Sequence, residues 1–154
     1  MGYRSEVAYS ICFEDTQVMG QFINHVFGSG DEHMIDALKE CEVDFDGLRI
    51  NFHAWDTKWY DSYDEVKGHI RLYTLPDKDD TPFFEKCDYK FMRVGEEQGD
   101  IDDEYSNHTS HRVDVHDEFY TNTSITLPFA SNYTPYGDTL KKLEESQPTE
   151  GEQA

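Results

Sequence analysis

The chain has to fold against its own charge. It carries 33 Asp and Glu residues but only 13 Lys and Arg residues, a formal net charge of −20 on 154 residues. A net charge this far from zero keeps a protein soluble, but it opposes the compact state through self-repulsion. Any stable fold must therefore bury enough apolar surface to overcome that repulsion. Hydrophobic residues make up only 36% of the chain, so the choice of apolar residue matters.

Aromatic residues supply much of that apolar surface. The chain contains ten Phe, ten Tyr and two Trp, and each of these side chains buries a large area when it enters a core. Disordered acidic chains are usually poor in aromatic residues. We therefore expect a single acidic domain over residues 1–129 and a polar, mobile tail over residues 130–154.

Hydrophobic periodicity predicts the first elements of this domain. Apolar residues alternate with small or polar ones over Arg4–Phe13, a pattern typical of a strand. Apolar residues then recur at helical spacing over Val18–Phe27, and Asp15 precedes them as a candidate N-cap. Asp31 can cap a second, shorter helix. The chain therefore begins with a strand followed by two helices.

The next part of the chain predicts another strand and another helix. Leu48–Trp55 alternates after a turn, which indicates a strand. Ser62 and Glu65 have the spacing of a capping box, in which each side chain satisfies a backbone N–H at the start of a helix. The helix that follows is expected to end near Pro76, because proline cannot continue a helix.

The fold class follows from the order of these elements. Two more strands are expected, over Tyr89–Val94 and Tyr120–Phe129, and Gly95–Glu118 between them is expected to be a long loop or a twisted hairpin. The order β-α-α-β-α-β-β predicts the α+β class, with helices packed on one face of a mostly antiparallel sheet of four to five strands. A ferredoxin-like arrangement is the nearest familiar template.

Cysteine usage and hydropathy predict the compartment. Cys12, Cys41 and Cys87 are odd in number and widely spaced, so we expect buried, reduced thiols. The N-terminus has no apolar signal region, and no stretch approaches the length of a membrane span. We therefore expect a cytoplasmic protein with no membrane partner.

The sequence contains no strong catalytic motif. It lacks the glycine-rich phosphate loops, the H-E-x-x-H zinc motif and the G-x-S-x-G nucleophile motif. We expect no enzymatic activity, no catalytic residue and no cofactor. The basic residues are dispersed and most have a carboxylate nearby in the sequence, so direct binding of nucleic acid is disfavoured.

One histidine cluster is a weak candidate for a metal site. His108, His111 and His116, with Asp114 between them, are residue types that bind zinc, manganese or iron. Their spacing, H-x2-H-x4-H, is not that of a standard site, and no cysteine joins them. A solvated acidic loop that contains histidines is the favoured interpretation. A small metal-dependent enzyme that uses this cluster is the alternative.

Two other clusters are candidates for contact with a partner. The first lies in the acidic segment Gly95–Glu118, where the candidate contact residues are Glu96, Glu97, Asp100, Asp102, Asp103 and Glu104. The second contains Trp59 and Tyr60, because Trp and Tyr are enriched in the hot spots of interfaces. The same two residues could instead pack at the corner between a strand and a helix, and we slightly favour that interpretation. Because they are adjacent, we do not expect both to point inward.

Three segments resemble small, uncharacterised proteins encoded by bacteriophages. They are MGYRSEVA at Met1–Ala8, FHAWDTKWY at Phe52–Tyr60 together with Ser62 and Tyr63, and YKFMRVGEE at Tyr89–Glu97. The resemblance covers roughly residues 1–129 and carries no catalytic residues. It implies a phage accessory gene that is expressed in the cytoplasm of a bacterial host.

The charge and the resemblance together predict a non-enzymatic phage accessory protein. It would be an anti-defence or host-takeover inhibitor that binds a basic, nucleic-acid-binding surface of a bacterial host or defence protein. DNA mimicry is the sharpest form of this hypothesis, because duplex DNA also presents closely spaced negative charges. An acidic structural or assembly protein, in which the charge gives only solubility, is a further alternative.

Overall fold

The computed structural model describes residues 2–106 and 135–146. In chain order the elements are β1 (Ser5–Phe13), α1 (Thr16–Gly28), α2 (Glu32–Glu40), β2 (Glu42–Asp44), β3 (Arg49–Thr57), α3 (Asp64–Tyr73), the 3₁₀ helix η1 (Leu75–Asp77), β4 (Cys87–Gly95), β5 (Ile101–Tyr105) and α5 (Tyr136–Ser146).

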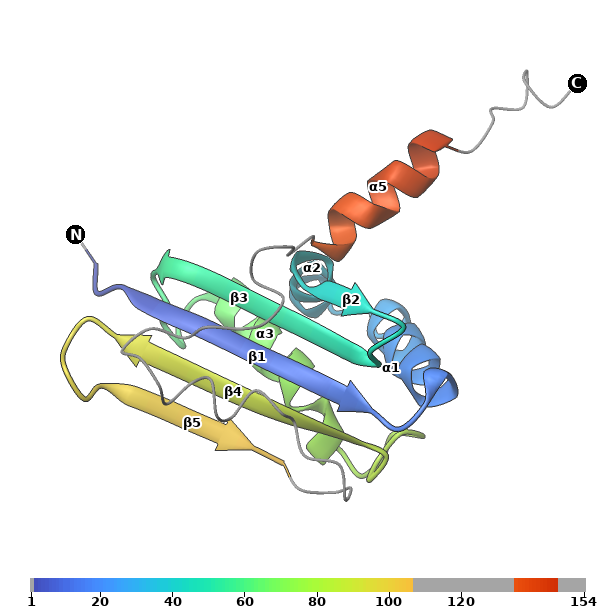
Figure 1. Cartoon of the computed structure of the whole chain (residues 1–154), viewed down its shortest axis with the longest axis horizontal. Helices are drawn as coiled ribbons and strands as arrows, with labels where there is room; N and C mark the ends of the chain where they lie inside the picture. The colour runs from blue at the N-terminus through green and yellow to red at the C-terminus, as the bar shows by residue number, and fades with distance from the viewer. Residues whose placement is uncertain (1, 107–134, 147–154) are drawn as a thin grey trace, which may run out of the picture.

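The strands form one sheet of five in the order β2-β3-β1-β4-β5, and every neighbouring pair is antiparallel. Helices α1, α2 and α3 lie behind this sheet in Figure 1, on one of its faces. The predicted α+β class, with helices on one face of an antiparallel sheet, is confirmed. The short strand β2 before β3 was not predicted. With α1 and α2 taken together as one connection, β1 to β4 follow the β-α-β-β-α-β order of the ferredoxin-like template, and β5 extends the sheet beside β4.

The fifth strand of this sheet lies where a loop or a twisted hairpin was expected. β5 occupies residues 101–105, inside the acidic segment, and forms a hairpin with β4. The strand predicted over Tyr120–Phe129 lies outside the described residues and stays a prediction. The boundary between residues 129 and 130 lies outside them as well.

The apolar core lies between the sheet and the helices. The inward residues of β1 are the four that the alternation predicts, Val7, Tyr9, Ile11 and Phe13, and none is more than 6% exposed. Helix α1 adds an apolar stripe that consists of Val18, Met19, Phe22, Ile23 and Val26. The predicted cap of this helix is confirmed, because the Asp15 carboxylate accepts a hydrogen bond from the Val18 N–H at 2.9 Å.

Tyr9 lies at the centre of this core and is fully buried. Its ring stacks on Phe52, with centroids 5.1 Å apart, and contacts Tyr73 at 5.0 Å. Its hydroxyl makes a hydrogen bond with His69 Nδ1 at 2.6 Å and contacts Cys41 Sγ at 3.4 Å. A buried tyrosine needs such a partner for its polar end. The side chain therefore ties β1 to β3, to α3 and to the residue after α2.

The second face of the sheet is polar, yet it is also buried. Ser10 donates a hydrogen bond to the side-chain oxygen of Asn51 at 2.6 Å, and His53 Nε2 lies 2.8 Å from a carboxylate oxygen of Glu6. Burial lowers the pKa of His53, although the hydrogen bond with Glu6 opposes that effect. Five residues on this face share the combination of polarity and burial: Ser10, Asn51, His53, Asp88 and Lys90.

The predicted capping box before α3 is wrong. The residue at the N-cap is Tyr63, and no side chain caps the helix there. Ser62 lies one residue too far from the first helical turn to serve as the N-cap. Asp64 and Glu65 in the first turn stabilise the helix through its dipole instead. The predicted end is close to the observed one, because α3 ends at Tyr73 and is followed by η1.

Helix α5 is 11 residues long and lies within the segment that the sequence analysis treats as a tail. The Tyr136 N–H donates a hydrogen bond of 2.5 Å to the Cys41 carbonyl, and the Tyr136 ring lies 6.5 Å from that of Phe27. The first turn of α5 is therefore attached to the end of α2, while its later part extends away from the sheet (Figure 1).

None of the three cysteines forms a disulfide with another, and the expected burial holds for two of them. Cys41 and Cys87 are buried, whereas Cys12 is only half-buried. Burial raises the pKa of the Cys41 thiol, and it raises the pKa of Cys87 to about 12. Over residues 2–106 and 135–146, no helix combines the length and the apolar character that crossing a membrane requires.

Replacement of Gly68 with Ala is expected to lower the free energy of unfolding by about 1–3 kcal/mol. A Cβ at this position would collide with the backbone carbonyl of His33, where α3 crosses α2. Gly20→Ala in α1 is the matched control, because a Cβ there meets no atom within 4 Å. That change should raise the free energy of unfolding by about 0.5–1 kcal/mol. Urea unfolding of both variants measures the difference, and equal effects would contradict the packing described here.

Candidate functional site

The six acidic residues predicted to contact a partner all lie on one hairpin. Glu96, Glu97 and Asp100 are in the turn, whereas Asp102, Asp103 and Glu104 are in β5. The Gly95 N–H donates to the Asp100 carbonyl at 2.8 Å and closes the turn. Gly99 adopts a φ of +84°, which glycine accepts without strain. We call residues 87–105 the acidic hairpin.

Arg93 neutralises part of this hairpin. Its guanidinium donates to Asp100 Oδ1 and to Asp102 Oδ2, each at 2.7 Å. The hydrogen bonds from Arg93 and from Tyr3 lower the pKa of Asp100. Asp102 lies directly opposite Arg93 in the register, so the pair also fixes β5 against β4.

Lys90 has a similar role on the other face of the hairpin. Its ammonium pairs with Asp103 and lies 5.0 Å from the centroid of the Tyr105 ring, which is the cross-strand neighbour of Lys90. Three of the six predicted contact carboxylates thus have an internal partner that holds the hairpin together.

The other three carboxylates keep their charge available. Within residues 2–106 and 135–146, Glu96, Glu97 and Glu104 form no ion pair with a Lys or Arg side chain. Glu104 accepts a hydrogen bond from the Tyr73 hydroxyl at 3.3 Å, which contributes to the raised pKa of that tyrosine, although burial is the larger cause. Every residue of β5 is exposed, including Ile101 at 49% and Tyr105 at 66%.

The N-terminal segment joins the acidic hairpin to the second predicted cluster. The Tyr3 hydroxyl donates to Asp100 Oδ2 at 2.5 Å and accepts from the Glu97 N–H at 2.9 Å. The carboxylate of Asp100 also raises the pKa of Tyr3. The Tyr3 N–H in turn donates to the Tyr60 hydroxyl oxygen at 2.6 Å. The two predicted contact clusters, distant in sequence, are therefore neighbours in space.

Trp59 is half-buried and packs against the core. Its ring lies 5.4 Å from that of His69, 6.1 Å from Phe91 and 6.2 Å from Phe52. Tyr60 is also half-buried, through its contact with Tyr3. The corner-packing interpretation therefore describes Trp59 well, and a contact role for either residue stays a prediction.

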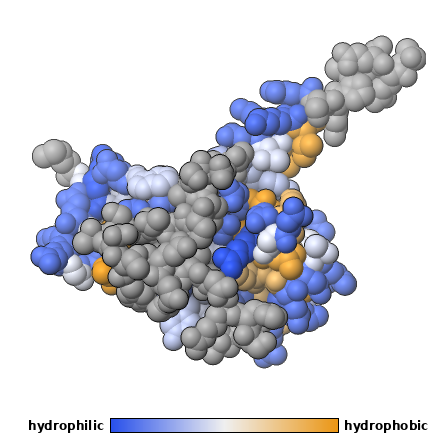
Figure 2. Space-filling model, in the orientation of Figure 1, coloured by the Kyte–Doolittle hydropathy of each residue, from blue (hydrophilic) through white to orange (hydrophobic). Residues whose placement is uncertain are grey.

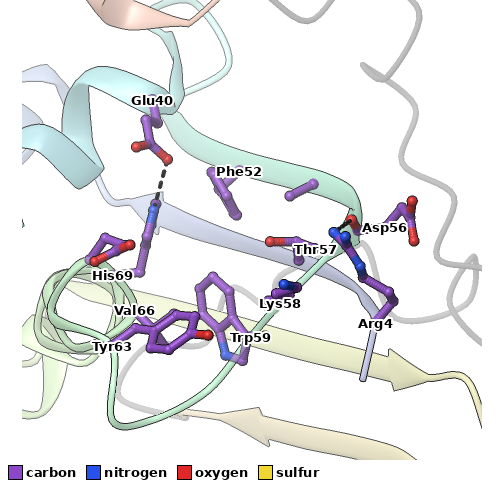
Figure 3. A pocket seen from close by; sticks show the side chains of 12 residues that line it. Arg4, Glu40, Phe52, Asp56, Thr57, Lys58, Trp59, Tyr63, Val66 and His69 are labelled. Atoms are coloured by element: carbon purple, nitrogen blue, oxygen red, sulfur yellow. Dashed lines mark hydrogen bonds and ion pairs between the residues drawn. The ribbon is translucent and has the colours of Figure 1, made fainter. Parts of the chain in front are cut away.

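One side of Trp59 lines a groove of about 470 Å³. The rings of Phe52, Tyr63 and His69 line it as well, together with Glu40, Glu65, Arg4 and Lys58. Figure 3 shows Glu40 above His69 at one end, while Arg4 and Lys58 lie at the other. We call this cavity the Trp59 groove. It has an aromatic floor, with a carboxylate at one end and side chains of both signs, Arg4, Lys58 and Asp56, toward the other.

His69 was given no role by the sequence analysis. It is 3% exposed, and both ring nitrogens have partners: Nδ1 with the Tyr9 hydroxyl and Nε2 with Glu40 at 3.0 Å. These partners lie 60 and 29 positions away in the sequence, so no local motif could have identified them. Tyr9 is fully buried, so its hydrogen bond holds the His69 ring in a fixed position, and Glu40 holds the ring from the other side. We interpret these two contacts as structural, because they place the His69 ring in the floor of the groove.

The candidate metal ligands His108, His111 and His116, with Asp114, lie outside the described residues. The metal hypothesis therefore stays a prediction. In the part of the chain that the structure describes, no group of three or more His, Cys, Asp or Glu side chains is arranged to bind a metal ion.

Comparison with known proteins adds no relative. No protein-family model matches the chain, and searches of curated proteins and of solved structures give no match.

Figure 2 shows that hydrophilic side chains cover most of the described surface on the face it presents. Hydrophobic side chains on that face gather mainly beside β2 and α1 and on α5. The exposed apolar residues of those regions include Phe27, Phe45 and Leu143. On the hairpin, the exposed apolar side chains Ile101 and Tyr105 instead flank the three carboxylates of β5.

Replacement of Arg93 with Gln is expected to raise the pKa of Asp100 toward its ordinary value, because the strongest hydrogen bonds to that carboxylate are lost. Asp31 is the matched control: its pKa is lowered by Arg71, which the substitution does not touch. Carboxyl titration by NMR measures both groups. In the native protein, the stabilisation from the Arg93 pair is present at neutral pH and is lost as the pH falls through the lowered pKa of Asp100. An unchanged Asp100 titration would contradict this assignment.

Proposed function

We propose that this protein binds a basic surface of another protein through the acidic hairpin, and that it does so without catalysing a reaction. The phage resemblance suggests the partner class, which is a bacterial host or defence protein in the cytoplasm. A surface that normally binds nucleic acid is the expected target, because such surfaces are strongly basic.

The observation that carries this proposal is the exposure of β5. Its sequence, Ile-Asp-Asp-Glu-Tyr, presents carboxylates between two exposed apolar side chains, Ile101 and Tyr105. Charges around an interface steer association and select the partner, whereas apolar and aromatic groups supply most of the binding free energy. β5 carries both kinds of group, and it is the last strand in the sheet order, next to β4.

The rigidity of the hairpin also supports binding. Arg93, Lys90 and Tyr3 hold its carboxylates through ion pairs and hydrogen bonds. A surface that is already ordered loses less conformational entropy when a partner binds. A solubilising surface has no need of such ordering.

DNA mimicry is the narrower form of the proposal. It requires negative charges that a partner can read as phosphates, and Glu96, Glu97 and Glu104 are the available candidates. The ion pairs of Arg93 and Lys90 offset part of the charge of Asp100, Asp102 and Asp103, which makes the hairpin less like a row of phosphates. Binding of a basic protein by the hairpin does not require such a likeness. Competition between the protein and duplex DNA for the same partner separates the two forms.

The triple variant E96Q/E97Q/E104Q is expected to weaken partner binding roughly tenfold at low salt, and by less at high salt. Glutamine can still accept the hydrogen bonds that Glu96 and Glu104 receive from Arg4 and Tyr73, so the fold should be kept. Affinity purification from expressing bacteria followed by mass spectrometry identifies the partner, and titration with the purified partner then gives the dissociation constants.

The matched control is D79N/D80N/E85Q. It removes the same number of charges from exposed positions in the loop before β4, at the opposite end of that strand from the hairpin turn. The control should bind almost as well as the native protein. Equal loss in both variants, or binding that is insensitive to salt, would contradict a role for the hairpin. Failure of duplex DNA to compete would remove mimicry alone.

A further inference from the structure

The Trp59 groove has the chemistry of a site for an organic cation. Its floor consists of aromatic rings, with Trp59 and His69 centroids 5.4 Å apart and Phe52 and His69 centroids 4.3 Å apart. Cations bind over such rings because the faces of the rings are electronegative, and Trp binds them best. The volume of about 470 Å³ is in the range of small-ligand sites.

Carboxylates line the helical side of this groove. The Glu40 side chain is 56% exposed at the end of α2, and its Oε2 is held 3.0 Å from His69 Nε2. Glu65, in the first turn of α3, also lines the groove and is exposed. A positive group that lies on the aromatic floor would therefore have carboxylates beside it. The net charge of the chain adds a long-range attraction for cations.

The opposite end of the groove carries both signs of charge, because Asp56 lines it together with Arg4 and Lys58. Arg4 donates from its guanidinium to the Asp56 carbonyl at 3.0 Å, and Lys58 lies beside it (Figure 3). A bare cation would gain little from this end, where Arg4 and Lys58 outnumber Asp56. An amino-acid residue with a positive side chain fits both ends, because its backbone carbonyl can face Arg4 and Lys58.

The groove is continuous with the acidic hairpin. Arg4 lines the groove, and its backbone N–H donates to Glu96 Oε1 at 2.7 Å. Tyr60, next to Trp59 in sequence, is bonded to the hairpin through Tyr3. A basic protein that binds the hairpin would therefore have its neighbouring side chains close to the groove.

We propose that the Trp59 groove binds an arginine side chain of the basic partner. This inference rests on the proposed function and names the residue type that the site recognises. Arginine fits better than lysine because its planar guanidinium can stack on the rings and pair with a carboxylate through two hydrogen bonds. The hairpin steers the partner, and the groove recognises one of its side chains.

The test uses Trp59 as its own reporter. The chain has two tryptophans, and Trp55 is exposed, so the W55F variant leaves Trp59 as the single tryptophan, which is excited selectively over the tyrosines. The probes are the blocked tripeptides Ac-Gly-Arg-Gly-NH2, the same peptide with Lys, and the same peptide with citrulline, the neutral isostere of arginine. We expect a saturable fluorescence change with the Arg peptide, a weaker one with Lys and none with citrulline.

Two substitutions test the carboxylates. Glu40→Gln retains an acceptor for His69 but removes the charge, and Glu65→Gln changes an exposed residue of α3. Each should weaken binding of the Arg peptide about tenfold, which corresponds to about 1.4 kcal/mol. Glu14→Gln is the matched control, because Glu14 is exposed and is not among the residues that line the groove. Circular dichroism of each variant verifies that the fold is intact.

The outcomes separate this inference from the proposed function. If the Arg and citrulline peptides bind equally, or if neither Glu variant changes the titration, the groove does not recognise arginine. Partner binding that depends on the hairpin would still stand in that case. If no partner requires the hairpin, the proposed function fails, whereas a selective Arg titration would still support the groove as an arginine site.

Discussion

The burial of Tyr9 at the centre of the sheet is the interaction on which the rest of the structure depends. This side chain stacks on Phe52, contacts Tyr73 and makes a hydrogen bond with His69, so it joins β1 to β3 and α3. A chain with a net charge of −20 needs strong apolar contacts to stay compact. Aromatic residues provide such contacts from a small number of sequence positions. The rings of Phe13, Phe22 and Phe83 extend the same packing at α1.

The carboxylates of this protein have two different roles. Asp100, Asp102 and Asp103 pair with Arg93 or Lys90 and build the hairpin, so their charge contributes to the fold. Glu96, Glu97 and Glu104 remain exposed on the structure that those pairs create. The net charge alone does not distinguish the two roles, because each residue counts equally in the sum. The second group contributes most of the charge that the hairpin presents to a partner.

The candidate site depends on contacts that join distant parts of the chain. Tyr3 and Arg4 bind Glu97, Asp100 and Glu96, and Tyr3 also binds Tyr60. His69 is held between Tyr9 and Glu40, and this places an aromatic ring in the floor of the Trp59 groove. The acidic hairpin and the aromatic groove are therefore parts of one surface, although the sequence presents them as separate clusters.

By itself, the sequence determined β1, α1, α2 and β3, because their apolar periodicity directly records which side chains are buried. It also located the acidic residues of the hairpin. Only the tertiary structure decided that residues 101–105 form a strand, since Ile-Asp-Asp-Glu-Tyr has neither alternation nor high strand propensity. That strand pairs with β4, and the ion pairs of Arg93 and Lys90 with Asp102 and Asp103 support the pairing. The place of Trp59 and the partners of His69 were decided in the same way, by non-local packing that no local pattern encodes.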